Sequence, residues 1–411
     1  MPPAGSVTGF AAFRYRDFSA FIFAKFFSAG TYHMMLMAVF YQVYDITGDP
    51  LNLAMVNLCM IVPVFVFALF TGWVADIFDR RNLLMVCYGV MALGALGLCI
   101  ESALGLTRLW PTYLLLTVIG TARAFSGPSS NALVPNLTPR AIFPNALAWN
   151  ESAGKTAQFV GPATGGFLYL IGPEVVYATA AATFALGMLA TLLISHRPAP
   201  HRRSAISLSF LLEGIRYVFI KRIILGALAI DLIAALMGGV QAVLPIFAKD
   251  ILEVGAQGAG ILRSAMAMGG LSAALLYTLV RLRRAGLTMR VAMFCYGAAA
   301  AVFALSTSFP LSIVALAVLG MAELTDANVR QTILQMATPD QLRGRVGAVN
   351  SISSSMGTEI GGFRAGAMAA VVGAVPAVAL GGAVVMLAAL SIPKLFPELA
   401  AVRRLDRIKA E

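Results

Sequence analysis

Charged residues are scarce in this sequence. Only 12% of the 411 residues are charged, whereas 59% are hydrophobic. A soluble globular chain carries about 25% charged residues, and half of that amount cannot cover a surface that faces water. The composition therefore excludes a soluble, disordered or fibrous protein and predicts a polytopic membrane protein. At about 20 residues for each spanning helix, the length allows roughly twelve spans.

Cysteine is scarce as well, and the usual catalytic motifs are missing. The four cysteines lie in apolar runs without a CxxC pair or a nearby histidine: Cys59, Cys87, Cys99 and Cys295. This pattern fits neither a disulfide framework nor a zinc site. The sequence also lacks HExxH, GxSxG and metal-ligand spacings. We therefore expect no enzyme activity, no metal site and no cofactor.

A nucleotide-binding loop is excluded by its own pattern. The tripeptide Gly154-Lys155-Thr156 resembles the end of such a loop, but Trp149 stands where the pattern requires its first glycine. The segment also lies inside an apolar run rather than between a strand and a helix. We therefore expect no binding of ATP.

The sequence does contain many apolar runs of spanning length. The first set is expected near residues 18–44, 51–75, 83–100, 111–132, 146–171 and 175–195, and the second near 223–248, 258–280, 289–309, 311–333, 346–372 and 375–395. The predicted fold is therefore all-α, with twelve transmembrane helices. We expect an N-terminal six-helix bundle at 1–195, a cytoplasmic linker at 196–222, and a C-terminal six-helix bundle with a cytoplasmic tail at 223–411.

The positive charge is distributed unevenly along this chain. With twelve spans, 22 of the 30 lysines and arginines fall in the connections and ends on one side, and two, Arg108 and Lys249, fall on the other. Such an asymmetry places both termini in the cytoplasm of an inner (plasma) membrane protein. It also explains the net charge of +11 without nucleic acid. Because Arg14 and Arg16 lead directly into a long apolar stretch, the N-terminus does not fit a cleavable signal peptide.

The second part of the linker is amphipathic. Apolar side chains such as Phe210 and Phe219 can share one face of a helix, while Glu213, Arg216 and Lys221 take the other. We interpret this segment as a short helix at the cytoplasmic membrane interface. The alternative is an early start to the seventh span.

The two halves of the chain resemble each other. A gapless shift of 200 residues aligns small and polar residues at matching points: Gly120 with Gly320, Thr138-Pro139 with Thr338-Pro339, Asn150 with Asn350, Gly161 with Gly361, and Gly166 with Gly366. This favours a duplicated six-helix unit with parallel halves, an arrangement found in many secondary transporters. Chance matching of small residues is the alternative.

The loop after the second span carries a recognisable signature. Residues 72–81, Gly-Trp-Val-Ala-Asp-Ile-Phe-Asp-Arg-Arg, resemble the G-x-x-x-D-x-x-x-R-R motif of the major facilitator superfamily. Gly72 permits close helix approach, Asp76 can bind backbone N–H groups or the arginines, and Arg80 and Arg81 anchor the cytoplasmic face. The resemblance implies that this cluster latches the outward-open state. Asp79 stands where the family often has glycine.

The fifth span resembles a second motif of this superfamily. Residues 157–166 follow the G-x-x-x-G-P-x-x-G-G pattern of proton-coupled exporters, with alanine in place of the first glycine; the matching residues are Gly161, Pro162, Gly165 and Gly166. Small residues make a flat packing face, and Pro162 bends the helix. Tight packing alone would also select this pattern. The segments 44–50 and 342–346 are most similar to the branch that contains the enterobactin exporter and drug-efflux proteins.

Ionisable residues inside the spans are the candidates for proton coupling. A coupling carboxylate must gain and lose a proton as its surroundings change, and we consider Glu323, Asp231 and Glu359 for this role. Asp231 could instead pair with Lys25 or Arg263, or be exposed at the cytoplasmic end of its span. Two further sets have partners in their own helix: Glu151 with Lys155, and Glu323, Asp326 and Arg330 on one face of the tenth span.

The substrate cavity is expected to use the remaining intramembrane polar residues. The candidates are Lys25, Arg123, Arg263, Tyr32 and His33. Arg123 could instead brace the helix bundle, and His33 could be a hydrogen-bonded packing residue. The sequence leaves the charge of the substrate open.

Together with the resemblance, these features predict a secondary active transporter that works by alternating access. The favoured function is proton-coupled export of a small amphipathic molecule, such as a siderophore or a drug, by a monomer powered by the proton gradient. An importer or uniporter of the same fold and a non-transporting membrane receptor are the alternatives.

Overall fold

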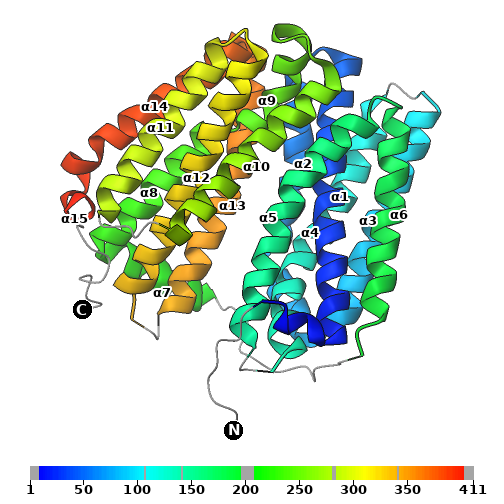
Figure 1. Cartoon of the computed structure of the whole chain (residues 1–411), viewed down its shortest axis with the longest axis horizontal. Coiled ribbons are helices and arrows are strands. Elements are labelled where there is room, and N and C mark those ends of the chain that lie inside the picture. The colour runs from blue at the N-terminus through cyan, green and yellow to red at the C-terminus, as the bar shows by residue number, and fades with distance from the viewer. Residues whose placement is uncertain are drawn as a thin grey trace. The chain divides into compact units, whose positions relative to one another are not determined.

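The computed structural model describes residues 9–105, 108–139, 142–195, 208–279, 284–339 and 342–401, and within these ranges it contains helices and no strand (Figure 1). Among these described residues, nine helical segments are long and apolar enough to cross a membrane. Three further helices, α4 (Leu109–Leu137), α5 (Phe143–Leu168) and α13 (Arg343–Val372), have 29, 26 and 30 residues. In the described part of the chain, the nine segments and these three helices together correspond to the twelve predicted spans.

The first compact unit consists of Met1–Gln42 and Cys59–Ile206. It contains α4 and α5. Its other elements are the short η1 (Ala11–Arg14), most of α1 (Arg16–Thr47), the second part of α2 (Pro50–Ile77), α3 (Arg80–Ala103) and α6 (Pro173–Leu192). Within this unit, which we call unit 1, α3 packs along both α4 and α6.

The second compact unit, unit 2, consists of Val43–Leu58 and Ser207–Glu411. Besides α13 it contains α7 (Leu208–Ile220), α8 (Arg222–Met237), α9 (Val240–Ile246), the short π-helical η2 (Phe247–Ile251), α10 (Gly255–Leu279), α11 (Ala285–Leu305), α12 (Phe309–Ala337), α14 (Ala374–Leu395) and α15 (Pro397–Ala400). In Figure 1, α11 and α14 run side by side, and α12 packs on both α10 and α11.

Residues 43–58, the end of α1 and the beginning of α2, group with unit 2 rather than with the predicted bundle at 1–195. Two polar contacts join this segment to the rest of unit 2. Lys249 forms an ion pair with Asp45 at 2.5 Å, and the Tyr44 hydroxyl donates a hydrogen bond to Asp250. The boundary between the units also falls at 206, inside the predicted linker of 196–222, so that α7 belongs to unit 2.

The linker helix is separate from the seventh span, as its amphipathic pattern predicts. Lys221 adopts an extended conformation (φ −91°, ψ 95°) between α7 and α8. In unit 2, Glu213 forms an ion pair with Arg345, and the Tyr217 hydroxyl donates to the carbonyl of Ala337 at 3.1 Å. Burial raises the pKa of Tyr217 above its ordinary range, so this hydroxyl keeps the proton that it donates. These two contacts therefore bind α7 to α13 and α12.

The seventh span is broken, whereas the sequence predicted one continuous helix over 223–248. Gly238 and Gly239 separate α8 from α9, and Gly239 adopts a left-handed conformation with φ +67°. This conformation favours glycine. Arg364 of α13 donates to the carbonyls of Leu236 and Met237, both at 2.7 Å, and to that of Gly238 at 3.3 Å. A guanidinium thus binds backbone oxygens that a helix end leaves without a helical partner.

Glycines matched by the 200-residue shift pack in the same way in the two units. A methyl group added at Gly120 of α4 would approach the backbone oxygen of Met60 on α2 to 3.0 Å. At Gly320 of α12, an added methyl group would overlap the backbone oxygen of Met266 on α10. Each glycine thus lets the fourth long helix of its unit approach the second, which supports the predicted duplication.

The glycines of the fifth and eleventh spans also allow close helix packing in both units. A methyl group added at Gly161 of α5 would overlap the backbone oxygen of Gly30 on α1, and one added at Gly361 of α13 would overlap that of Ala235 on α8. A methyl group added at Gly165 would lie 2.8 Å from the backbone oxygen of Met34 on α1. Pro162 lies inside α5 between these contacts, and both Pro162 and Gly166 are buried. The predicted small-residue face therefore packs against α1.

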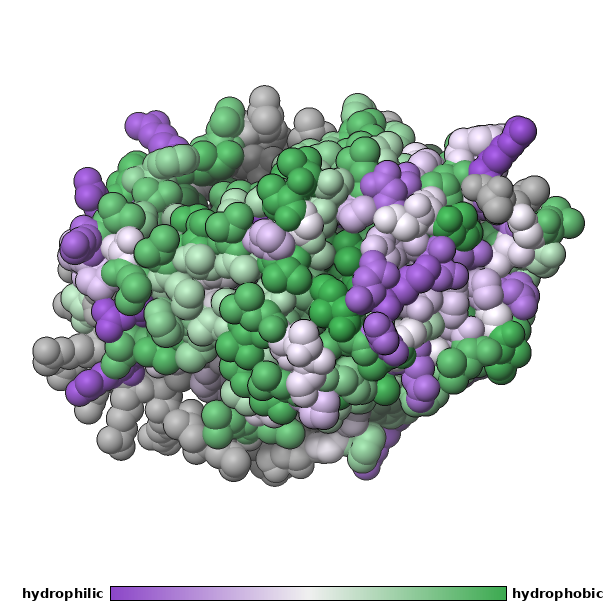
Figure 2. All heavy atoms as spheres, turned by 90° about the horizontal axis from the view of Figure 1, so that it is seen from above, coloured by the Kyte–Doolittle hydropathy of each residue, from purple (hydrophilic) through white to green (hydrophobic). Residues whose placement is uncertain are grey.

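Large apolar side chains are exposed along the spanning helices, for example Leu93 and Leu186 in unit 1 and Leu387 and Leu390 in unit 2. Figure 2 shows one face of the molecule, where apolar side chains cover much of the surface and hydrophilic ones gather in smaller groups. Exposed apolar surface on this scale marks contact with a membrane, as the composition predicts.

Candidate functional site

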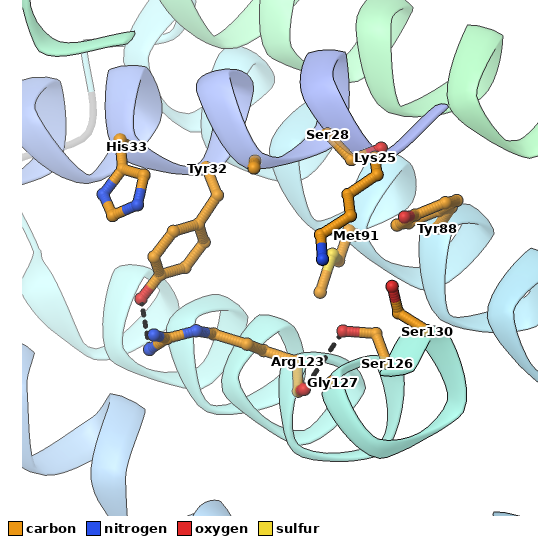
Figure 3. Close-up of a pocket in the computed structure, with 11 residues that line it drawn as sticks. Lys25, Ser28, Tyr32, His33, Tyr88, Met91, Arg123, Ser126, Gly127 and Ser130 are labelled. Carbon is orange, nitrogen blue, oxygen red and sulfur yellow. Dashed lines mark hydrogen bonds between the residues drawn. The ribbon is translucent and has the colours of Figure 1, made fainter. Parts of the chain in front are cut away.

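A cavity of about 290 Å³ lies inside unit 1. It is lined by residues of α1, α3 and α4: Lys25, Ser28, Ala29, Tyr32, His33, Tyr88, Met91, Arg123, Ser126, Gly127 and Ser130. Figure 3 shows Tyr32 reaching from α1 toward Arg123 on α4, with the Lys25 side chain extending into the same space. Four of the five predicted cavity residues therefore meet here, and Arg263, the fifth, belongs to unit 2.

Lys25 is positioned by an asparagine of the fifth span. Its Nζ donates a hydrogen bond of 2.7 Å to Oδ1 of Asn150, which is only 1% exposed. A lysine within a span is costly in lipid and is normally directed toward the protein interior. The Asn150 amide fixes the ammonium on the cavity side of α1.

Arg123 is positioned by the Tyr32 side chain. Its Nη1 donates to the Tyr32 hydroxyl at 2.8 Å, and its guanidinium carbon lies 4.4 Å from the centre of the Tyr32 ring. The ring attracts the cation through its π face. Arg123 and Tyr32 thus form one wall of the cavity.

The sequence reasoning missed two serines of this cavity. Ser28 and Ser130 are 5% and 7% exposed, and neither hydroxyl has a hydrogen-bond partner in the described part of the chain. A weak signal for them exists in the sequence, because Ser28 follows Lys25 by three positions and Ser130 follows Arg123 by seven. Both spacings place two residues on one helix face. Tyr88 and Met91 of α3 carry no such signal.

Unit 2 contains a buried ionic network around Arg330 of α12. The guanidinium lies 3.0 Å from Asp231 of α8 and 3.5 Å from Asp326 of its own helix. It also donates to Asn350 and, at 3.0 Å, to Ser354, both of α13. Ser354 in turn donates to Asp231 at 2.6 Å. Three helices thus converge on one cation.

The position of Asp231 bears on the alternative that it pairs with Lys25 or Arg263. Neither Lys25 nor Arg263 is the partner that the structure shows; Asp231 pairs with Arg330, which lies 99 positions away in the chain. Arg263 of α10 is buried and donates to Gln241 at 3.4 Å. Hydropathy could not predict the Asp231 pair, because the two partners lie in different spans.

Asp326 is the most deeply buried member of the network. It is 2% exposed, and its Oδ1 has no hydrogen-bond partner within the described residues. Arg330 is 6% exposed. Two carboxylates therefore share one guanidinium in an apolar environment, which leaves a negative excess when both are ionised. Such an excess is costly in a low-dielectric interior.

The other predicted coupling residues are less buried than Asp326. Glu323, one turn before Asp326 on α12, is exposed, and Glu359 of α13 is half-buried. The tenth-span face predicted to hold Glu323, Asp326 and Arg330 thus divides in two. Asp326 and Arg330 form the i,i+4 ion pair, and Glu323 lies outside it.

The asparagines matched by the repeat perform related tasks. In unit 1, Asn150 accepts a hydrogen bond from Lys25 of the first helix. In unit 2, Asn350 accepts one from Arg330 of α12. The same position of the duplicated unit thus binds a cation in both units, although each cation comes from a different helix.

The predicted latch is described only in part. Gly72 and Asp76 fall outside the residues whose side chains the structure describes, as do Glu151 and Lys155. Arg80 is half-exposed at the start of α3. Arg81 is buried and donates to the carbonyls of Thr191 at 3.0 Å and Leu192 at 2.6 Å, at the end of α6.

Asp79, where the family often has glycine, is the N-cap of α3. Its Oδ1 accepts hydrogen bonds from the backbone N–H groups of Arg81 at 2.9 Å and Asn82 at 3.4 Å. A carboxylate at this position satisfies N–H groups that lack helical partners and complements the helix dipole. The departure from the family motif therefore has a local structural role.

Comparison with known proteins agrees with this architecture. The model of the transmembrane secretion effector family matches residues 7–409. The enterobactin exporters EntS of Shigella boydii serotype 18 and Escherichia coli O157:H7 are each 24% identical to this chain over 355 residues, which cover 86% of this chain and 85% of the exporter.

Solved structures show the same fold at lower identity. A bacterial homologue of the human lysosomal transporter Spinster has a TM-score of 0.71 at 14% identity and covers 95% of this chain and 97% of its own. A D-xylose–proton symporter has a TM-score of 0.69 at 15% identity and covers 94% and 99%. The predicted all-α transporter fold is thereby confirmed. The chain belongs to the transmembrane secretion effector family of the major facilitator superfamily, and it is a membrane transporter.

Proposed function

We propose that this transporter is a proton-coupled exporter of a small amphipathic molecule, such as a siderophore or a drug. It works by alternating access as a monomer in the inner membrane, with both termini in the cytoplasm, and the proton gradient supplies its energy without ATP or a cofactor. The direction is supported by relatives that are named enterobactin exporters. The close packing of Gly161 and Gly165 on α1 also fits the exporter motif.

The observation that carries proton coupling is the charge imbalance around Arg330. Asp231 and Arg330 form a balanced ion pair supported by Ser354. Asp326 adds a second carboxylate, with an oxygen that has no partner among the described residues. A proton on Asp326 removes the excess negative charge and supplies a hydrogen-bond donor.

Loss of that proton changes the contacts of the whole network. An ionised Asp326 competes with Asp231 for the Arg330 guanidinium, which also holds α13 through Asn350 and Ser354. The protonation state of Asp326 thus biases how α8, α12 and α13 are held together. A transporter needs such a link between proton occupancy and helix arrangement in order to couple the two.

The break between α8 and α9 provides a place where the bundle can adjust. The two segments are joined by Gly238 and Gly239 and held by Arg364 through three backbone oxygens. Discontinuous helices are frequent near transport sites. We assign this break the role of a hinge within unit 2.

The test uses purified protein in proteoliposomes with an imposed pH gradient. Enterobactin and the cationic dye ethidium serve as probes. The proposal expects accumulation of at least one probe when the interior is acidic, as antiport requires. Accumulation driven instead by an acidic exterior would indicate a symporter, and no response to either gradient would refute proton coupling.

The coupling residue is tested in the same vesicles with Asp326→Asn. This variant should lose gradient-driven accumulation by at least about tenfold, while exchange of labelled for unlabelled probe without a gradient continues. Glu253→Gln, which removes a carboxylate from the exposed loop before α10, is the matched control and should behave as the wild type. Gradient-driven accumulation that survives in Asp326→Asn would overturn the assignment of the proton site.

A further inference from the structure

The short helix α7 lies where a spanning helix enters the membrane. Its 13 residues are too few to cross a bilayer, which takes about 20 residues. One extended residue, Lys221, separates α7 from α8, which begins at Arg222 as the first part of a spanning segment. Because the start of a span lies at the boundary between lipid and water, α7 lies at that boundary too.

One face of α7 packs against the rest of unit 2. Val218 is 4% exposed, and a methyl group added at Gly214 would come within 2.8 Å of the backbone oxygen of Arg345 on α13. Gly214 and Val218 are four positions apart and therefore share this face. The Tyr217 hydroxyl adds a hydrogen bond to the carbonyl of Ala337 on α12. These contacts fix which side of α7 is turned away from the protein.

The opposite side carries large apolar side chains. Leu212, Ile215 and Phe219 are 55%, 39% and 66% exposed. Spacings of three and four positions place them in one stripe along the helix. Exposure of such a stripe to water is unfavourable, whereas a helix at the lipid boundary can insert its apolar side into the edge of the hydrocarbon region.

Positive charge is concentrated around this stripe. Residues 196–222 contain six lysines and arginines but a single acidic residue, Glu213. Three of these cations precede residue 208 and lie outside the described residues. The ion pair with Arg345 already neutralises Glu213. The segment therefore has an excess of positive charge that Glu213 does not balance.

Arg216 is the cation beside the apolar stripe. It is exposed, and it lies three and four positions from Phe219 and Leu212, so these side chains are neighbours on the helix surface. When the two apolar side chains enter the lipid, the long Arg216 side chain can extend to the level of the head groups. Its planar fork matches the oxygens of a phosphate. Clusters of lysine and arginine next to a spanning helix favour membranes that contain anionic lipids.

We propose that the outward face of α7, formed by Leu212, Ile215, Arg216 and Phe219, binds anionic phospholipid at the membrane surface. The three apolar side chains enter the edge of the leaflet, and Arg216 binds the phosphate of an anionic head group. This inference goes beyond the proposed transport function, because it gives α7 a ligand of its own. Since α7 is joined to α12 and α13, a lipid bound here also stabilises unit 2.

The test measures thermal unfolding of the delipidated full chain in dodecyl maltoside micelles. Phosphatidylglycerol and phosphatidylcholine with the same acyl chains are added to separate samples, which then differ in head-group charge. Phosphatidylglycerol should raise the unfolding temperature by at least about 2 °C more than phosphatidylcholine. About 0.5 M NaCl should reduce this difference by half or more, because salt screens the attraction. Equal shifts with the two lipids, or a difference that salt does not reduce, overturns the proposal.

A soluble phosphate compound distinguishes a lipid from a free anion. sn-Glycerol 3-phosphate should give no shift at concentrations at which phosphatidylglycerol does, because it has no acyl chains to accompany the apolar stripe. A shift as large as that of the lipid would show that the segment binds soluble phosphates, and lipid binding would then be wrong.

Variants tie the lipid preference to α7. Arg216→Gln should remove at least about half of the difference between the two lipids, and Arg216→Lys should keep most of it. Phe219→Ser should weaken stabilisation by both lipids, because it removes apolar surface from the stripe. The matched control is Lys394→Gln, which removes an exposed cation at the end of α14 and should behave as the wild type.

The assignment to α7 fails if Arg216→Gln keeps the full lipid difference, or if Lys394→Gln loses as much of it. Arg216 and Phe219 are both exposed, so their variants should fold, and either one decides the question alone. The samples contain neither substrate nor a pH gradient. Their outcome is therefore independent of the proposed export.

Discussion

Replacing Arg330 with glutamine is expected to be strongly destabilising. The substitution removes the guanidinium that lies 3.0 Å from Asp231 and 3.5 Å from Asp326, and it leaves both carboxylates in place. The Asp326 side chain is 3% exposed and the Asp231 side chain 15%, so water can compensate little of the lost interaction. Removing one partner of a buried ion pair costs about 3–5 kcal/mol, and we expect a loss in that range.

A comparison of variants shows whether uncompensated charge is the cause. If it is, the triple variant Arg330→Gln, Asp231→Asn and Asp326→Asn should be more stable than Arg330→Gln alone, because neutral groups replace the two carboxylates. The free energy of unfolding is measured by denaturant titration in detergent micelles, with Lys394→Gln as the control. A loss below about 1 kcal/mol for Arg330→Gln, as for an exposed pair, would refute the reasoning. So would a triple variant that is less stable than the single one.

Three further predictions concern the helices and their orientation. Gly161→Ala should lower stability by about 1–3 kcal/mol and slow transport, because the added methyl group overlaps the Gly30 oxygen. Gly154→Ala in the same helix is the control. A methyl group there meets no described atom within 4 Å, so this variant should change neither stability nor transport. Gly239→Ala should cost about 1–2 kcal/mol from its left-handed conformation, and more from overlap with the Gly361 oxygen; thermal unfolding of the purified variant measures it. Epitope tags at both ends should be accessible from the cytoplasm only, and a tag exposed outside intact cells would contradict the charge distribution.

Much of the fold could be predicted because hydropathy and charge act locally. The amphipathic α7 is recognisable from its own residues, and each long helix begins and ends within a few residues of an apolar run. The break in the seventh span could not be found in this way. Gly238 and Gly239 lie within Arg222–Ile251, a segment apolar enough throughout to count as one span, and the arginine that stabilises the break, Arg364, is more than 120 positions away. Only the folded chain brings these groups together.

The candidate sites could likewise be predicted from the sequence only where the residues lie in one helix. Lys25 and Tyr32 are seven positions apart on one helix, a spacing that places both on one face, and the structure brings both to the cavity. The ranking of the carboxylates depended instead on contacts between helices. Asp231 has few cations near it in sequence but lies against Arg330, and of the two carboxylates predicted on one face of the tenth span, Asp326 is buried and Glu323 is exposed.

The repeat also explains how one duplicated scaffold can serve two ligands. The 200-residue shift places Arg123 of unit 1 at the position of Glu323 in unit 2, and Ser130 at the position of Arg330. In unit 1 these positions line the cavity that contains most of the predicted substrate-site residues, whereas in unit 2 the second of them is the centre of the carboxylate network. Substrate and proton then bind to different side chains and do not compete for one group. A variant of Asp326 should therefore change the response to a pH gradient without changing the equilibrium affinity for the transported probe, and a fall in both together would show that the two sites are not separate.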